Sequence, residues 1–109
     1  METEPRMIEI YKTREGKRPY ADWFHSLNVD IQKKIYIRLK RVAEGNFGDH
    51  HSEGKGVWAL IFDYGPGYRV YYGLNGNTLV LLLNGGSKKR QDRDIALAQK
   101  YWEDYKTNN

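Results

Sequence analysis

Cysteine is absent from this chain of 109 residues, and so is any long hydrophobic run. Without cysteine the chain has neither a disulfide framework nor a thiolate metal site, and a reducing compartment is compatible with it. No apolar stretch reaches the length that spans a membrane, and the polar N-terminus lacks the apolar segment of a signal peptide. These absences predict a soluble protein of the cytoplasm that has no membrane partner.

Acidic residues are fewer than basic residues in this chain. Fourteen Asp and Glu stand against 18 Lys and Arg, which gives a net charge of +4 and a pI near 9.3. A basic balance favours a polyanionic partner without requiring one. The length is that of one domain, and no repeat or linker divides it. We expect a flexible extension at residues 1–6, followed by a single domain over residues 7–106.

The first half of the chain predicts one strand and two helices. Strand-forming types occupy Met7–Tyr11, and Pro19 fits the first position of a helix whose aromatic residues share one face over residues 20–27. Asn28 can cap a second helix with an apolar stripe, which ends at Gly45. Because hardly any loop separates them, the two helices are expected to form a hairpin.

The segment over residues 46–56 is rich in glycine and has no hydrophobic period, so we expect a loop there. It contains His50 and His51, a pair that raises the question of a metal site. In an extended loop the two side chains point in different directions, and no third ligand lies near in sequence. Both are interpreted as surface residues.

Three antiparallel strands are expected in the second half, at Val57–Phe62, Tyr68–Leu74 and Thr78–Leu83. The turn Asn75-Gly76 is a strong hairpin signal, because both positions can take positive φ. The pair Gly85-Gly86 is expected to break the last strand before a helix begins near residues 89–92. The order β-α-α-β-β-β-α predicts an α+β fold, in which an N-terminal helical hairpin and a C-terminal helix pack on an antiparallel sheet.

This hairpin brings an arginine towards a basic segment. Parity places Arg69 and Tyr71 on one face of the sheet, and pairing across the turn brings Gly67–Arg69 towards Asn84–Lys88. A phosphate at that end would meet a guanidinium group, lysine ammonium groups and backbone N–H groups at a helix start. An arginine paired with a structural carboxylate, followed by a solvated basic run, fits the same residues, so both interpretations stay open at this point.

Four stretches carry a family resemblance: Gly45–Asp49, Tyr64–Tyr72, Leu81–Lys88 and Gln91–Ile95. They closely resemble toxins of bacterial type II toxin–antitoxin modules, in the RelE/ParE superfamily and its HigB-like "addiction module killer" branch. The likeness runs from about Met7 to Tyr105 and is most specific in the motif Gly-Pro-Gly-Tyr-Arg-Val-Tyr.

The resemblance implies a RelE-like, microbial-RNase-like fold and an endoribonuclease that cuts messenger RNA (mRNA) on the translating ribosome and so inhibits translation. It implies no metal and no cofactor. It also implies neutralisation by a cognate antitoxin, usually a helix-turn-helix protein from the neighbouring gene, with operator DNA contacted only through that antitoxin.

Residue roles follow from the same resemblance. The implied catalytic residues are Arg69, which would stabilise the transition state, Lys88, and Tyr71 as a base-stacking or proton-relay residue. The implied RNA-binding residues are Lys55, Lys89 and Arg90. Tyr68 joins them as an expected RNA-binding residue because a tyrosine at this end of the sheet can stack on a base.

One departure from the family pattern concerns the strand beside Arg69. The branch commonly has Glu-Leu-Arg where this chain has Ala59-Leu60-Ile61, so a carboxylate and a cation are missing and activity is expected to be weakened or lost. Two alternatives keep the fold and change the function. One is a ParE-like inhibitor of DNA gyrase, and the other is a degenerate co-repressor that binds antitoxin and has no nuclease activity.

Overall fold

The computed structural model describes residues 5–108. Most of the expected flexible extension, residues 1–4, lies outside the described residues. Arg6 is described: its backbone N–H donates to the carbonyl of Ala43 at 2.6 Å, and its guanidinium carbon lies 5.0 Å from the centroid of the Phe47 ring. Within the described chain, no helix combines the length and apolar character needed to cross a membrane.

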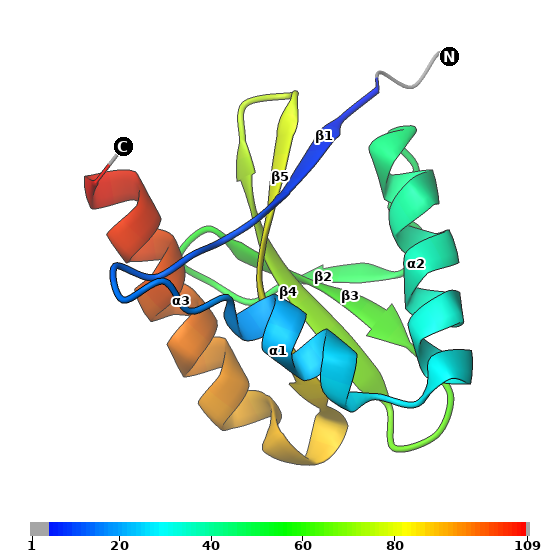
Figure 1. The fold of residues 1–109 in the computed structure, drawn as a ribbon. Helices are drawn as coiled ribbons and strands as arrows, with labels where there is room; N and C mark the ends of the chain where they lie inside the picture. Colours follow the sequence, from blue (N-terminus) through cyan, green and yellow to red (C-terminus); the bar gives the residue numbers. More distant parts are fainter. Residues whose placement is uncertain (1–4, 109) are drawn as a thin grey trace.

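A five-stranded sheet with the order β1-β5-β4-β3-β2 forms the centre of the molecule (Figure 1). The strands are β1 (Met7–Ile10), β2 (His50–Ser52), β3 (Val57–Phe62), β4 (Tyr68–Asn75) and β5 (Leu79–Ser87). The α+β class is therefore confirmed, but the wholly antiparallel sheet is wrong, because β1 runs parallel to β5. A parallel neighbour needs a long crossover, and the rest of the chain between β1 and β5 supplies it.

The segment expected to be a loop contains a strand. β2 pairs antiparallel with β3, with His50 opposite Leu60 and Ser52 opposite Trp58. All three β2 residues are exposed at the edge of the sheet, so they carry no alternation of apolar and polar side chains. Because that alternation is missing, these residues carry no strand signal.

Helices cover both faces of the sheet. The elements are α1 (Pro19–Ser26), α2 (Val29–Ala43) and α3 (Gln91–Thr107), with a short 3-10 turn at Lys88–Arg90 before α3. One core cluster joins α1 and α2 to one face, and a second joins α3 to the other. The start of the last helix is close to its expected position.

The expected helical hairpin is wrong. Figure 1 shows α2 turning away from α1 instead of running beside it. The two helices lie on different strands: α1 packs on β5, whereas the Arg38 guanidinium of α2 donates to the Ile61 carbonyl of β3 at 2.6 Å. The short connection therefore leads the chain across the sheet, and an open space remains between the helices.

Large helix side chains sit directly on glycines of the sheet. The Trp23 indole covers Gly85, and the Trp102 indole covers Gly73, so closely that a Cβ at either glycine would overlap the ring. β5 runs through the glycine pair to Ser87, and the expectation that these residues break the strand is wrong. They are glycine because a helix side chain occupies the space that a Cβ needs.

Candidate active site

The end of β4 and the basic segment meet as the hairpin predicts. Arg69 lies opposite Gly86 in the register of β4 and β5, and Tyr68 lies opposite Ser87. The Lys88 N–H donates to the Gly67 carbonyl at 2.7 Å, which joins the start of the 3-10 turn to the turn before β4. The predicted approach of these two segments is confirmed.

Arg69 is half-buried, yet its guanidinium group makes no hydrogen bond or ion pair within residues 5–108. Arg38, which is also half-buried, behaves in the opposite way. Its guanidinium donates to the carbonyls of Ile61, Phe47 and Asp49, and burial lowers its pKa. In the described chain Arg69 is therefore not the structural ion pair that the sequence left open, and its five donors are available to an anion.

Three further cations follow Gly86, the strand partner of Arg69, along the chain. Lys88, Lys89 and Arg90 form the 3-10 turn that leads into α3, and all three are exposed. The N-terminal end of a helix carries a partial positive charge, which adds to theirs. This corner of the molecule can therefore attract a phosphate chain.

A carboxyl group from α3, that of Asp94, also lies at this end of the sheet. Asp94 is only 9% exposed, and its side chain fills the space beside Gly86 that a Cβ would need. The Asn84 side-chain amide donates to the Asp94 carbonyl at 3.1 Å and fixes this turn of the helix. Burial raises the pKa of the Asp94 carboxyl, and the charges of Arg90 and Arg93 oppose that shift.

Asp94 is not among the site residues predicted from the sequence, although its spacing carries a signal. Asp94, Ala98 and Trp102 are the buried residues of α3 and follow one another at four-residue spacing. That spacing places the aspartate on the apolar face of the helix. A carboxyl group at the head of a buried stripe indicates a functional site more strongly than a solvated helix-start acid does.

Tyr71 lies on the same face of the sheet, beneath α3. Its ring is fully buried, and its hydroxyl has no hydrogen-bond partner in the described part of the chain. Burial raises its pKa, and Arg69 opposes the shift. The ring offers no exposed surface on which an RNA base can stack, so proton relay is the implied role that suits this position better.

Two expected RNA-binding residues lie apart from Arg69. Tyr68 points to the opposite face, where its ring centroid is 6.4 Å from that of Trp23. Lys55 has a φ of 53° in the turn before β3, at the end of that strand away from Ile61, and it lines a hollow beside the second half of α3. The structure thus brings together Arg69, Tyr71 and Lys88, with Lys89 and Arg90 adjacent, but neither Lys55 nor the Tyr68 ring.

The replaced family positions also fall on the Arg69 face. Ile61 lies directly opposite Arg69, and Ala59 lies opposite Tyr71. Ala59 is fully buried in the cluster beneath α3, whereas Ile61 is partly exposed at its margin. The β3 side of the site is therefore apolar.

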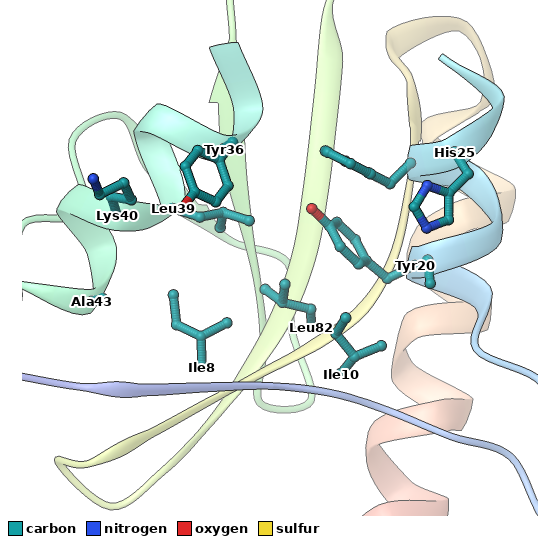
Figure 2. A pocket seen from close by; sticks show the side chains of 11 residues that line it. Ile8, Ile10, Tyr20, His25, Tyr36, Leu39, Lys40, Ala43 and Leu82 are labelled. Carbon is teal, nitrogen blue, oxygen red and sulfur yellow. The ribbon is translucent and has the colours of Figure 1, made fainter. Parts of the chain in front are cut away.

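A second feature is an apolar groove on the opposite face of the sheet. Figure 2 shows it between α1, α2 and β1, with the Tyr20 hydroxyl directed into the space. Its volume is about 420 Å³. It is lined by Ile8, Ile10, Tyr20, Ala21, Phe24, His25, Tyr36, Leu39, Lys40, Ala43 and Leu82.

Comparison with known proteins connects this geometry to a family. The model of the family described as "Phage derived protein Gp49-like (DUF891)" matches residues 22–103, from α1 to the last turns of α3. The chain belongs to the Gp49-like family. This family is toxin-like, and its members are often found in toxin–antitoxin modules.

The chain is also similar to a protein of Haemophilus influenzae that is described as an uncharacterized protein. The two are 43% identical over 81 residues, which cover 73% of this chain and 82% of the relative. The family match spans the whole candidate site, since Arg69, Lys88 and Asp94 all lie within residues 22–103.

Proposed function

We propose that this Gp49-like protein is the toxin of a type II toxin–antitoxin module and cuts mRNA on the translating ribosome, as the RelE/ParE resemblance implies. One observation carries the proposal: Arg69 is half-buried and makes no hydrogen bond or ion pair within residues 5–108, and it lies beside a row of exposed cations. An arginine held in this way is ready to bind a phosphate through two parallel hydrogen bonds.

The chemistry needs extra stabilisation of negative charge on phosphorus. In metal-independent RNA cleavage the 2′-hydroxyl attacks the adjacent phosphate, and a five-coordinate phosphorus forms that carries more charge than the substrate. In this proposal Arg69 donates to the non-bridging oxygens, and exposed Lys88 serves the leaving 5′ oxygen. Donors placed where charge develops lower the barrier most, because they need no rearrangement during the reaction.

Two assays after brief expression in bacteria test this function. Mapping of mRNA 5′ ends is expected to show cuts within translated codons, while plasmid supercoiling stays normal. Intact mRNA together with gyrase-linked DNA breaks would contradict the proposal and support the ParE-like alternative. Intact mRNA with normal supercoiling would support the degenerate co-repressor.

The apolar β3 side of the site predicts weakened cleavage. Ile61→Arg places a second guanidinium group directly opposite Arg69 at a partly exposed position, and the cleavage rate is expected to rise on the order of tenfold. Ile61→Met is the matched control, because it keeps the position apolar and should change the rate less than about twofold. The measurement is the initial rate of mRNA cleavage by purified protein with translating ribosomes. Equal rates for the wild type and Ile61→Arg would show that the native site is not attenuated.

The partner in this proposal is an antitoxin, a helix-turn-helix protein encoded by the neighbouring gene, and part of it binds the apolar groove. Tyr36 is 60% exposed and Ile10 is 41% exposed at the groove, so a binding partner would cover them. Within the described residues, the groove is lined by Lys40 and His25 but by no carboxylate. An antitoxin segment with apolar side chains and nearby carboxylates matches these walls.

Charge reversal at the groove tests that partner. Lys40→Glu is expected to raise the dissociation constant for the neighbouring gene's product by about tenfold or more, because a like charge then faces its carboxylates. Arg41→Glu makes the same change on the next residue, which lines a different hollow, and should shift binding by less than about threefold. Calorimetry with the two purified proteins measures both values. Equal effects would contradict docking at the groove, and failure of the wild type to bind would contradict the partner.

A further inference from the structure

The carboxyl group of Asp94 lies at the strand position opposite Arg69. Arg69 and Gly86 are directly opposite each other, and the side-chain positions of such a pair are about 5 Å apart on one face of the sheet. Gly86 has no side chain, and the Asp94 carboxyl occupies the place of its missing Cβ. The first turns of α3 thus deliver an acidic group to the position beside the unpaired arginine.

The hydrogen-bonding capacity of this carboxyl is unused. Among the described residues it accepts no hydrogen bond and forms no ion pair. Neither of its oxygens is among the fully enclosed polar atoms that lack a partner, so both keep some contact with solvent. Most buried side-chain oxygens are bonded within the protein, whereas these two are left open to water or to a bound substrate.

A structural role does not explain the exception. An acidic residue in the first turn of a helix interacts favourably with the helix dipole, but exposed Asp92 already serves that purpose. The groups around the Asp94 carboxyl are Tyr71 from β4, Asn84 from β5, Arg90 from the 3-10 turn and Arg93 from α3, and Arg69 of β4 lies opposite Gly86. None of them neutralises it by direct pairing.

The position of Asp94 also bears on the β3 residues that differ from the family pattern. Ile61, Arg69 and Gly86 lie in one row across β3, β4 and β5. The family pattern leads us to expect charged residues on the β3 side of that row, where this chain is apolar. Asp94 supplies a carboxylate from the β5 side of Arg69 instead.

We infer that Asp94 is the general base of the site and removes the proton of the attacking 2′-hydroxyl. The proton moves to an Asp94 carboxylate oxygen as the 2′ oxygen bonds to phosphorus. The bond from phosphorus to the 5′ oxygen breaks, and that oxygen takes a proton from the Lys88 ammonium group. The products are a 2′,3′-cyclic phosphate and a 5′-hydroxyl, and both side chains exchange protons with water afterwards. The inference rests on the proposed ribonuclease function.

Asp94→Asn tests the role with little change of shape. Cleavage of mRNA by purified protein with translating ribosomes is expected to fall by about 10²–10⁴-fold. Binding of the variant to the same ribosome–mRNA complex should change less than about threefold, since the amide keeps the size of the side chain. Asp92→Asn removes an exposed acid from the same helical turn and should cleave within about twofold of the wild type.

The pH dependence separates proton transfer from a structural role. The base acts only when it is ionised, so the wild-type rate should rise with pH through the raised pKa of Asp94 and then level off. Asp94→Asn should lose that rise. Its melting temperature near neutral pH should equal or exceed that of the wild type, because a buried carboxylate that prefers its proton destabilises the fold once it is ionised. Asp94→Ser provides a second variant, with the same expected loss of cleavage.

Three results would overturn the inference. Cleavage by Asp94→Asn within about twofold of the wild type would remove Asp94 from proton transfer while leaving the ribonuclease function intact. A parallel loss of binding and folded structure in both variants would make Asp94 structural. Wild-type protein that leaves mRNA intact would contradict the ribonuclease function itself, and the inference with it.

Discussion

Replacement of Arg69 by alanine is expected to lower mRNA cleavage by about 10²–10³-fold or more and to leave the protein folded. In residues 5–108 no carbonyl or carboxylate depends on the Arg69 guanidinium, so its removal leaves no buried group unpaired. The developing charge on phosphorus, by contrast, loses a donor that lies ready beside Gly86. Initial cleavage rates and circular dichroism of the purified variant measure both effects.

Two further arginine variants sharpen that result. Arg69→Lys keeps the charge but loses the two-pronged geometry, so it should recover only part of the activity. Arg38→Ala removes a guanidinium that bonds to backbone carbonyls of β3 and the preceding loop, and stability should fall by about 2 kcal/mol. The opposite pattern, with Arg69→Ala unfolded, would identify Arg69 as a structural residue and contradict the proposed site.

Replacement of Gly73 by alanine is expected to destabilise the fold by about 3 kcal/mol or more. An added Cβ would overlap the Trp102 indole, which is 5% exposed. The ring has no free direction in which to move, because it stacks on Tyr105 with centroids 5.5 Å apart and its Nε1 also lies against Gly56. Either α3 or β4 must shift, and α3 carries Asp94 into the site.

Urea unfolding measures this effect. The free energy of unfolding of Gly73→Ala should fall as stated, whereas Asn77→Ala, in the exposed turn after β4, should change it by less than about 0.5 kcal/mol. A Gly73→Ala variant as stable as the wild type would show that α3 is not anchored through Trp102.

Local patterns predicted that β4 and β5 pair and bring their ends together. The connection is formed by residues 76–78 and not by a two-residue turn at Asn75-Gly76, because Asn75 belongs to β4 and pairs with Leu79. The signal still predicted the hairpin of β4 and β5, and parity placed Arg69 and Tyr71 on one face. These inferences depend on neighbours in the chain and on geometry that any hairpin obeys. The same reasoning failed at the edges of the sheet. The parallel partner of β1 depends on a crossover of the whole chain, and β2 is three exposed polar residues long.

The two glycines of β5 show why the rest of the site could not be predicted from the sequence. Gly85 and Gly86 have the composition of a strand break, and only the packed helices reveal that each glycine makes room for a particular side chain. Gly86 makes room for the Asp94 carboxyl, and this contact depends on how α3 packs on the sheet. The four-residue spacing of Asp94, Ala98 and Trp102 could have placed that aspartate on the buried stripe of α3, but it could not show that the carboxyl lies across from Arg69.

The chemistry of the cut ends tests the central claim most directly. Purified protein added to translating ribosomes should leave mRNA fragments with a 2′,3′-cyclic phosphate on one side of each cut and a 5′-hydroxyl on the other, because the 2′-hydroxyl is the nucleophile. The Arg69→Ala variant should yield almost none of these ends. Fragments with 5′-phosphate ends, or mRNA that stays intact with the wild-type protein, would contradict the account.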